Sequence, residues 1–357
     1  MAGPFTFDVL PFDPHTAPPE LWAERHLFRR ARHAQSGADE PPPSDTWFEA
    51  LERQPSAFGH NVHWVARTEG RIVGIVGAFL PNPDQPDIQA ALHHLYADGF
   101  VLKEWRRRGI GRRLLTEIHG LMTAHGKSVL TLSSEDADGH AFLRAIGADE
   151  RLRSVDSRLA LDTVDRAMVE DWHEAMHRAV PGLTETIHAG EVPDTEFEAI
   201  LPLHNALLPD LPRDRLDQPL VPVTMAMALE WKSQLHFQKI AHHMVVLRDA
   251  DGSVIGFSDI VRHPDVPDRV YQVITGLRRD RRGLGVGKGL KAALLRHIRS
   301  ALPSVRLMVT RNAATNGPML AINRRLGYTE HKVLGTYQIG VEALGLSRGS
   351  AAGSAPA

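Results

Sequence analysis

Apolar and polar positions follow the same order in the two halves of the chain. In each half, two strand-like runs joined by a glycine turn, Glu69-Gly70 or Asp251-Gly252, precede a third apolar run. A basic glycine loop, an amphipathic helix, a further strand and a short helix then follow. We predict first-half strands at 62–66, 72–79, 94–101 and 128–132, and helices at 114–126 and 140–145. The corresponding second-half strands are at 244–248, 254–261, 271–277 and 305–310, and the helices at 288–300 and 318–326. This shared order predicts a duplicated domain, each copy built from strands and helices.

The segment between the two copies sets the expected domain boundary. Residues 158–161 have the pattern of a strand that closes the first copy, and 164–177 have that of a helix that ends before Pro181-Gly182. We therefore predict an N-terminal domain at 1–165 and a C-terminal domain at 166–346. Residues 347–357 are rich in Gly, Ser and Ala and are expected to form a disordered tail.

Composition narrows the class of protein. With 357 residues, 43% of them hydrophobic, each half has enough apolar side chains for its own core. A formal net charge of −2 gives no overall positive field to attract nucleic acid or an anionic membrane. The absence of cysteine excludes disulfides and a thiol nucleophile and is typical of a reducing compartment. The chain has no apolar run near the ~20 residues of a membrane helix and no secretory signal, so we expect a cytoplasmic protein. We expect it to be a monomer or a homodimer.

The most informative motif is an R-x-x-G-x-G loop that occurs once in each copy, beginning at Arg106 and at Arg282. A second landmark, Gly147 or Gly327, follows each loop, at offsets of 147 − 106 = 41 and 327 − 282 = 45 residues. Glycines between a strand and a helix let several backbone N–H groups approach one anion, and the helix N-terminus adds its positive dipole. The motif therefore predicts an anion site in each copy, assisted by flanking basic side chains such as Lys288.

Two nucleotide-binding alternatives fit less well. A Walker loop requires Gly-Lys-Ser or Gly-Lys-Thr, whereas Lys288 is followed by Gly289. A dinucleotide fold requires G-x-G-x-x-G in a βαβ unit, whereas three strands precede each loop here. Neither a nucleoside triphosphatase nor an oxidoreductase is favoured.

The loops, together with the second-half run from Thr310 to Tyr328, resemble the GCN5-related N-acetyltransferase (GNAT) family, whose acyl-CoA loop reads Q/R-x-x-G-x-G/A. The asparagine-rich run is similar to the late strand and helix of actinobacterial members. The resemblance spans most of both halves, an arrangement also seen in mycothiol synthase. It implies two tandem α+β folds. Each would be a mixed sheet flanked by helices that splays open after its third strand, with pantetheine lying in the gap.

By this resemblance the cofactor is acetyl-CoA or another acyl-CoA, and the acceptor is the amine of a small molecule. The implied cofactor-binding residues of the second copy are Leu277, Arg282, Gly283, Leu284, Gly285, Val286, Gly287, Lys288, Asn316 and Asn323. Those of the first copy are Leu102, Arg106, Arg107, Gly109, Ile110, Gly111 and Arg112. For the asparagines, helix capping and turn formation are the alternative explanation.

The acid and base of the transfer are less evident. The family's tyrosine acid stands four residues before the late glycine, where this chain has Asn323 and Leu143. An alkylammonium has a pKa near 10, so a base must deprotonate the acceptor. Candidate bases are Asp259 and Glu230 in the second copy and Asp98 in the first, with His263, His93 and His94 as further alternatives.

We expect the second copy to be the catalytic one, because its match to the family pattern is fuller. The missing tyrosine leaves a second hypothesis, a non-catalytic acyl-CoA sensor or scaffold. No metal is expected, because the pairs His60/His63 and His242/His243 have no third ligand in the sequence pattern.

Overall fold

A computed structural model describes residues 5–344, and these form two compact units. Unit 1 contains the chain up to Leu152, the segment Arg215–Pro219 and the chain from Gly335. Unit 2 contains Arg153–Asp214 and Leu220–Leu334. Each unit has its own set of strands and its own hydrophobic clusters. The expected tail at 347–357 lies outside the described residues.

Unit 1 contains a sheet of strand order β1-β2-β3-β4-β5-β12. The β4–β5 pair is parallel, and the other neighbours are antiparallel. Its elements are β1 (Asp8–Phe12), α1 (Pro19–Ser36), α2 (Asp45–Glu52), β2 (Gly59–Thr68), β3 (Arg71–Pro81), β4 (His94–Val101), α3 (Ile110–Ala124), β5 (Val129–Ser134), α4 (Ala137–Ala145) and the last six residues of β12 (Thr329–Gly340).

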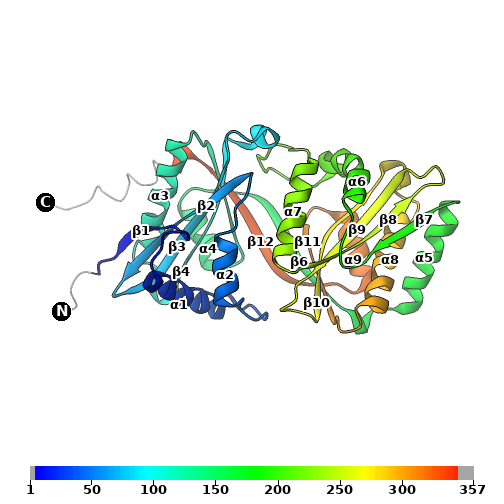
Figure 1. Cartoon of the computed structure of the whole chain (residues 1–357), viewed down its shortest axis with the longest axis horizontal. Helices are drawn as coiled ribbons and strands as arrows, with labels where there is room; N and C mark the ends of the chain where they lie inside the picture. Colours follow the sequence, from blue (N-terminus) through cyan, green and yellow to red (C-terminus); the bar gives the residue numbers. More distant parts are fainter. Residues whose placement is uncertain (1–4, 345–357) are drawn as a thin grey trace. The chain divides into compact units, whose positions relative to one another are not determined.

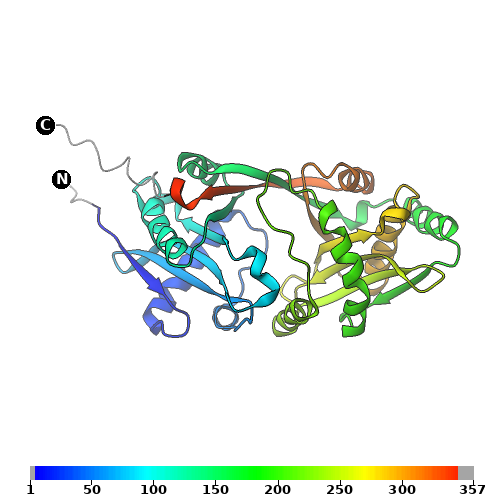
Figure 2. The ribbon, with the colours of Figure 1, turned by 90° about the horizontal axis from the view of Figure 1, so that it is seen from above.

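Helices cover both faces of this sheet (Figures 1 and 2). On one face α3 and α4 pack on the sheet through Ile110, Ile118 and Leu143. On the other, α1 and α2 contribute Trp22, Phe28 and Phe48. Neighbouring residues of β2 divide between the faces, since Val65 joins the second cluster and Ala66 the first.

Unit 2 has the matching strand order β6-β11-β10-β9-β8-β7, with β10 and β11 parallel. Its elements are the last seven residues of β6 (Asp149–Ala160), α5 (Arg166–Ala179), β7 (Thr184–His188), α6 (Asp194–Leu207), α7 (Met225–Phe237), β8 (Ala241–Arg248), β9 (Val254–Arg262), β10 (Arg269–Leu277), α8 (Val286–Ala301), β11 (Leu307–Ala313) and α9 (Gly317–Leu326). The expected strands and helices of both copies are therefore present, and the fold class is confirmed.

The sheet of unit 2 is also covered on both faces (Figure 1). Val245 and Leu247 of β8 pack with α5 and α8, while Met244 and Val246 of the same strand pack with α6 and α7. Helix α5 lies directly on α8, and a Cβ at Gly289 would stand 2.2 Å from the Cβ of Met176. Gly289 therefore serves this close helix contact rather than the glycine loop.

The last strand of each sheet comes from an unexpected part of the chain. Strand β6 follows α4 but pairs with β11, from Ser154↔Ala313 to Ala160↔Leu307. Strand β12 follows α9 but pairs with β5, through Gly335–Gly340. Each unit thus differs from the expected domains 1–165 and 166–346, because a hydrophobic pattern identifies a strand but not its partner.

Candidate active site

In unit 2 the parallel strands β10 and β11 separate partway along their length. They pair from Arg269↔Leu307 to Gln272↔Thr310. Beyond that pair, in residues 5–344, β10 runs on to Leu277 beside β9, and β11 runs on to Ala313 beside β6. Backbone groups that face such a gap are available to the amides of an extended ligand.

Unit 1 has the same separation between β4 and β5. The described pairs run from His94↔Val129 to Tyr96↔Thr131, and β4 then continues to Val101 beside β3. The sequence-based expectation that each sheet splays after its third strand agrees with both units.

Each gap leads to a glycine loop with the same backbone conformation. Gly109 and Gly285 are the N-cap residues of α3 and α8, and each has a φ of 83°. A side chain at this φ is strained, which explains the glycine. The first helical residues, Ile110 and Val286, are buried, so the N-terminus is anchored while its free N–H groups point to the loop. Apart from Asn316 and Asn323, which belong to α9 and its N-cap, the predicted cofactor-binding residues of both copies lie along this path, from the strand end through the loop to the first helical turn.

The first arginine of each motif closes its loop. Nε of Arg106 donates to the carbonyl of Val101 at 3.1 Å, and Nε of Arg282 donates to that of Leu277 at 3.3 Å. In both units the bonded carbonyl belongs to the last residue of the strand before the loop. The arginine thus fixes the strand-to-loop turn, a role separate from anion binding.

Carboxylates hold several of the remaining arginines of the second loop. Asp210 accepts hydrogen bonds from Arg279 and Arg282, which lower the pKa of its carboxyl to about 2. Asp249 pairs with Arg278 and Arg281, and the bond from Arg281 is the main cause that lowers its pKa. An incoming phosphate would compete with these carboxylates for the guanidinium groups.

Strand β10 carries a β-bulge just where it leaves β11. Its register with β9 shifts between Gln272 and Thr275. In the bulge the N–H of Ile274 donates to Oδ1 of Asp259 at 2.9 Å, and Oδ2 of Asp259 lies 2.8 Å from Nε2 of His242. Asp259 is only 2% exposed. Both of its oxygens are thus engaged within the protein, and its carboxylate holds the bulge in place.

A buried polar network lies behind the gap of unit 2. Nζ of Lys291, on α8, donates to Oε1 of Gln272 at 2.9 Å and to Oδ1 of Asn323 at 2.6 Å. Asn323 in turn donates to Asn312 at 2.8 Å, and Gln272 donates to Thr275 at 2.7 Å. The network thus joins β10, α8, α9 and β11.

Burial of Lys291 has an electrostatic consequence. Its side chain is 2% exposed and its Nζ lies 5.3 Å from the ring centre of Tyr328. Desolvation lowers the pKa of Lys291 from 10.5 to about 7 and raises that of Tyr328. Lys291 is not among the site residues predicted from the sequence. Its only signal is a lysine on a helix whose neighbours Leu290, Ala292 and Ala293 are apolar.

The two predicted asparagines differ in their surroundings. Asn316 is the N-cap of α9, and its side chain accepts the N–H of Met319 at 3.3 Å. Asn323 is 2% exposed and belongs to the Lys291 network. Capping, the alternative considered for Asn316, is therefore present, and cofactor contact by either residue stays a prediction.

The remaining candidate bases lie in different units. Glu230 is half-buried on α7, one of the two helices on the α6 face of the unit 2 sheet. Asp98 is exposed on β4 of unit 1 and pairs with Arg32 at 3.1 Å. His242 and His243, considered as a possible metal pair, point to different partners, Asp259 and His297. The structure thus supplies each histidine with a partner that the sequence pattern did not reveal.

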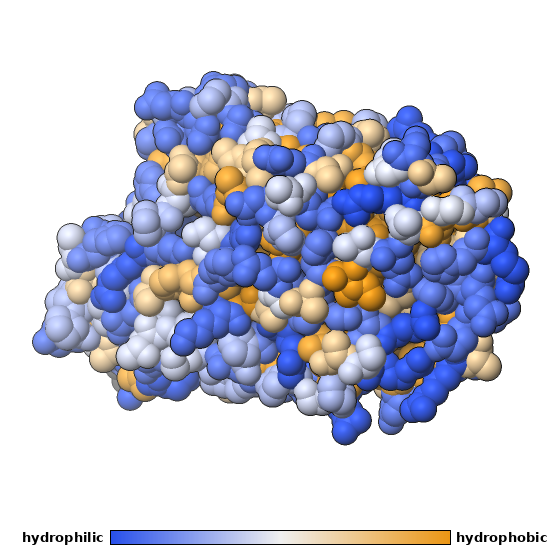
Figure 3. Space-filling model, turned by 45° about the vertical axis from the view of Figure 1, so that its right-hand side comes forward, coloured by the Kyte–Doolittle hydropathy of each residue, from blue (hydrophilic) through white to orange (hydrophobic). Residues whose placement is uncertain are grey.

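The surface gives no sign of one dominant patch in the view of Figure 3, where hydrophilic residues cover most of the face and apolar ones are scattered. Within residues 5–344, no helix has both the length and the apolar character that a membrane crossing demands.

Comparisons with known proteins agree with this geometry. The family model described as "Acetyltransferase (GNAT) domain" matches residues 59–147. A comparison of the sequence with curated proteins finds no match. The family-model match thus lies in unit 1, whereas the fuller match to the family's sequence motifs lies in unit 2.

Solved structures resemble the whole chain. A tandem GNAT protein from the clavulanic acid biosynthesis pathway matches with a TM-score of 0.71 and 22% identity, over 94% of this chain and 99% of that one. A GCN5-related N-acetyltransferase from Sphaerobacter thermophilus matches with a TM-score of 0.62 and 13% identity, over 94% and 96%. A glucosamine N-acetyltransferase region of a fungal multi-domain β-N-acetylglucosaminidase matches with a TM-score of 0.64 and 15% identity, over 94% of this chain and 38% of that one.

Proposed function

We propose that the chain transfers an acyl group from acetyl-CoA, or another acyl-CoA, to the amine of a small molecule. A GNAT acetyltransferase domain model matches residues 59–147, and the fold of a tandem GNAT protein matches over 94% of the chain, which supports this proposal. The observation that carries this proposal is the gap between β10 and β11, which joins a β-bulge at one end to the Gly285 helix N-terminus at the other. Unit 2 is proposed as the catalytic unit, because the bulge and the buried lysine network belong to it.

In this proposal the cofactor follows the gap. The pyrophosphate binds the N–H groups of the glycine loop and of the first turn of α8. The pantetheine arm lies along the part of β10 that does not pair with β11, from beyond Gln272 up to Leu277. The thioester then reaches the bulge, where backbone N–H groups polarise its carbonyl as an oxyanion hole does.

The chemical step is a direct attack. The neutral amine nitrogen attacks the thioester carbon, a C–N bond forms, the C–S bond breaks, and the coenzyme leaves as a thiolate that takes up a proton. The ammonium form of the acceptor must first lose a proton to a base. Of the three carboxylates considered, Asp259 is enclosed and Asp98 lies in unit 1, so Glu230 is proposed as the base.

Lys291 is proposed as a positioning residue. Asn323 stands where the family has its tyrosine, and a carboxamide is a poor proton donor. Lys291 holds the side chain of Gln272, on β10, and that of Asn323, on α9, through hydrogen bonds from its Nζ. Its ammonium form also favours a developing thiolate nearby.

A paired measurement tests the proposal. Acetyl-CoA is titrated into the full-length protein by calorimetry, and thiol release is followed over a panel of amines. Binding with amine-dependent release is expected. Binding without release for any acceptor would favour the alternative, a non-catalytic acyl-CoA sensor, which the missing tyrosine motivates. Failure to bind any acyl-CoA would contradict both.

A further inference from the structure

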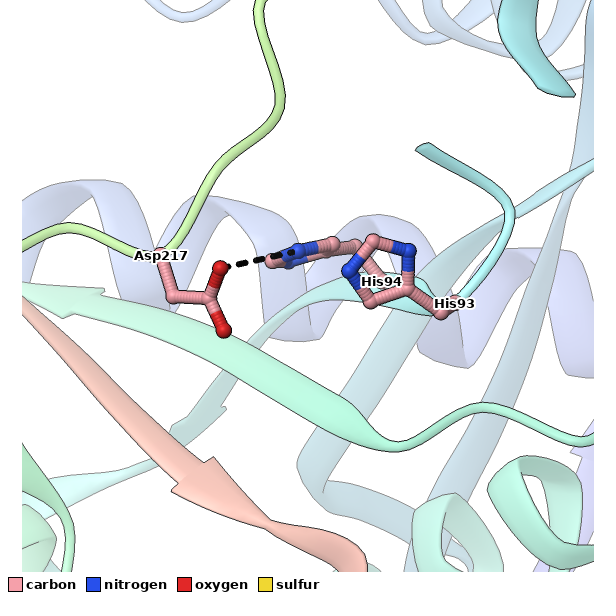
Figure 4. A group of neighbouring side chains, drawn as sticks. All are labelled: His93, His94 and Asp217. Carbon is pink, nitrogen blue, oxygen red and sulfur yellow. Dashed lines mark ion pairs between the residues drawn. The ribbon is translucent and has the colours of Figure 1, made fainter. Parts of the chain in front are cut away.

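A histidine pair and an aspartate meet in unit 1, at the end of β4 opposite to its glycine loop. His94 is the first residue of β4 and His93 directly precedes it, and Asp217 belongs to the Arg215–Pro219 segment of the same unit. One ligand-type atom from each of the three lies within 4.8 Å of the others. Figure 4 shows the carboxylate of Asp217 pointing to the ring of His94, with the His93 ring beside it.

The ring of His94 is buried without hydrogen bonds within residues 5–344. Its side chain is 1% exposed, yet neither ring nitrogen has a hydrogen-bond partner among the described residues. Nε2 of His94 lies 4.0 Å from Oδ1 of Asp217, beyond hydrogen-bond distance. A buried polar group without a partner is costly, on the order of 1–3 kcal/mol. A ligand between His94 and Asp217 would remove that cost.

The surrounding backbone holds the group in place. Gln338 of β12 accepts the N–H of Asp217 at 2.8 Å and donates to its carbonyl at 2.8 Å, so the segment is fixed from both sides. The carbonyl of His93 accepts the N–H of Ser128 at 2.8 Å. The rings of His93 and His94 lie 4.1 Å apart between centroids. The Asp217 side chain remains 70% exposed, which leaves it room to move.

We propose that His93, His94 and Asp217 bind a divalent transition metal ion of the zinc class. Two imidazoles and a carboxylate are a ligand set that zinc accepts, and three protein ligands leave a fourth position for water. Ligand atoms around tetrahedral zinc stand roughly 3–3.5 Å apart. The three groups therefore need to close by only about 1 Å. This site departs from the expectation that the chain has no metal, which rested on other histidine pairs.

A second group of the same type serves as a contrast. His173, His177 and Glu185 of unit 2 also lie close together, but Nε2 of His173 is already 2.8 Å from Glu185. Nη1 of Arg296 lies 2.9 Å from the His173 ring nitrogens. A guanidinium at that distance opposes a divalent cation, so this group is not proposed as a site.

The test uses the full-length protein after treatment with a chelator. Zn²⁺ is titrated by calorimetry, and Co²⁺ is added as a spectroscopic probe, whose visible absorption reports tetrahedral nitrogen and oxygen ligands. We expect one ion per chain. Asp217→Asn and His93→Gln should each weaken Zn²⁺ binding by more than the roughly 10–100-fold that loss of an outer-shell partner costs.

Matched controls separate this site from other ligands. Asp214→Asn changes the same loop and His125→Gln replaces an exposed histidine, and both should bind Zn²⁺ as the unchanged protein does. Glu185→Gln should also leave binding unchanged. The proposal is overturned if the unchanged protein binds no Zn²⁺, or if Asp217→Asn and His93→Gln both bind it with unaltered affinity. Circular dichroism of each variant excludes loss of fold as the cause.

Discussion

The two units share a strand order, a splayed pair of parallel strands and a glycine loop, but they differ in what stands behind the gap. In unit 2, Lys291 lies six residues after Gly285, and Asn323 four before Gly327. The positions at the same spacing in unit 1 are Leu115 and Leu143, both in the hydrophobic cluster. A fold can thus keep its glycine loop and its strand gap while one copy fills the interior with apolar side chains and the other with a polar network.

The strand before the gap differs in the same way. In unit 2, Gly256 of β9 pairs with Leu277, the last residue of β10. Asp259 stands three residues after Gly256 on β9, and its carboxylate holds the bulge of β10. In unit 1, the position equivalent to Gly256 is Gly74 of β3, which pairs with Val101, the last residue of β4. Gly77 stands three residues later on β3, at the position of Asp259, and it pairs with Asp98 without a bulge. The bulge therefore distinguishes the units at the place where a thioester carbonyl would lie.

The largest effect should come from the two loop glycines. Gly109 and Gly285 have the same φ of 83° and open space around them, so a Glu substitution strains both equally. Gly285→Glu should lower amine-dependent thiol release by roughly 1,000-fold or more, because it places a carboxylate in a proposed phosphate site. Gly109→Glu should leave release within about threefold, with melting temperatures measured for both. Equal losses would refute the assignment of catalysis to unit 2.

The next effect concerns the proposed base. Glu230→Gln should lower kcat by about 100-fold or more, the ordinary range for loss of a general base. The loss should shrink at high pH, where more of the acceptor amine is already neutral. Asp98→Asn, in unit 1, is the control and should keep full turnover. A normal kcat–pH profile for Glu230→Gln would remove this residue from the mechanism.

Asp259 should matter through the bulge. Asp259→Ala leaves His242 and the Ile274 N–H without their buried partner, and we expect a loss of about 2–4 kcal/mol in the free energy of unfolding. Asp259→Asn keeps an acceptor for Ile274 and should lose less than half of that. Denaturant unfolding and thiol release are measured on both variants. If Asp259→Asn is fully folded but inactive, Asp259 is the base instead.

Gly77 of unit 1, at the position equivalent to Asp259, is the matched control for the Asp259 variants. A Cβ on Gly77 would meet the His63 ring at 2.5 Å, so Gly77→Ala should cost about 1–3 kcal/mol of stability. Its folded fraction should retain turnover, since no bulge is present there.

The last effect, which is spread over several pH units, is a pH dependence of the free energy of unfolding due to Lys291. Its pKa is about 7 in the folded protein and 10.5 as the ordinary value, so between these pH values the unfolded chain binds more protons. Below pH 7 the buried ammonium of Lys291 lowers the free energy of unfolding by its full amount. Between pH 7 and 10.5 the free energy of unfolding rises with pH, by up to about 1.4 kcal/mol per pH unit. Lys291→Met should lack this rise in denaturant unfolding at pH 7, 8 and 9. Parallel curves for the two proteins would contradict the assignment.

Much of the fold could be predicted because the local patterns are strong. The expected run 94–101 coincides with β4, and the turn Glu69-Gly70 joins β2 and β3 as predicted. Both glycine loops are found between a strand and a helix. These features depend on residues near one another in the chain, and sequence patterns report such features well.

What could not be predicted depends on distant parts of the chain. The burial of Lys291 depends on Gln272 of β10 and Asn323 of α9, which lie 19 and 32 positions from it in the chain. Helix α8 is buried on nearly every side, so its own pattern does not mark one residue. The group of His93, His94 and Asp217 joins residues more than 120 positions apart. The partner of β6 is likewise decided by pairing in space.

The exchange of the closing strands determines when each unit can become complete. Unit 1 cannot fill the sheet position beside β5 until Gly335–Gly340 has left the ribosome, although nearly all its other elements lie before residue 152. Until then the edge of β5 is open, and open edges invite pairing with other chains. A fragment cut near residue 165 would keep that open edge permanently and would carry β6 without β11. The first half of the chain therefore cannot complete its fold until β12, near the end of the second half, has been synthesised. The two copies of the fold become complete together, although one is translated before the other.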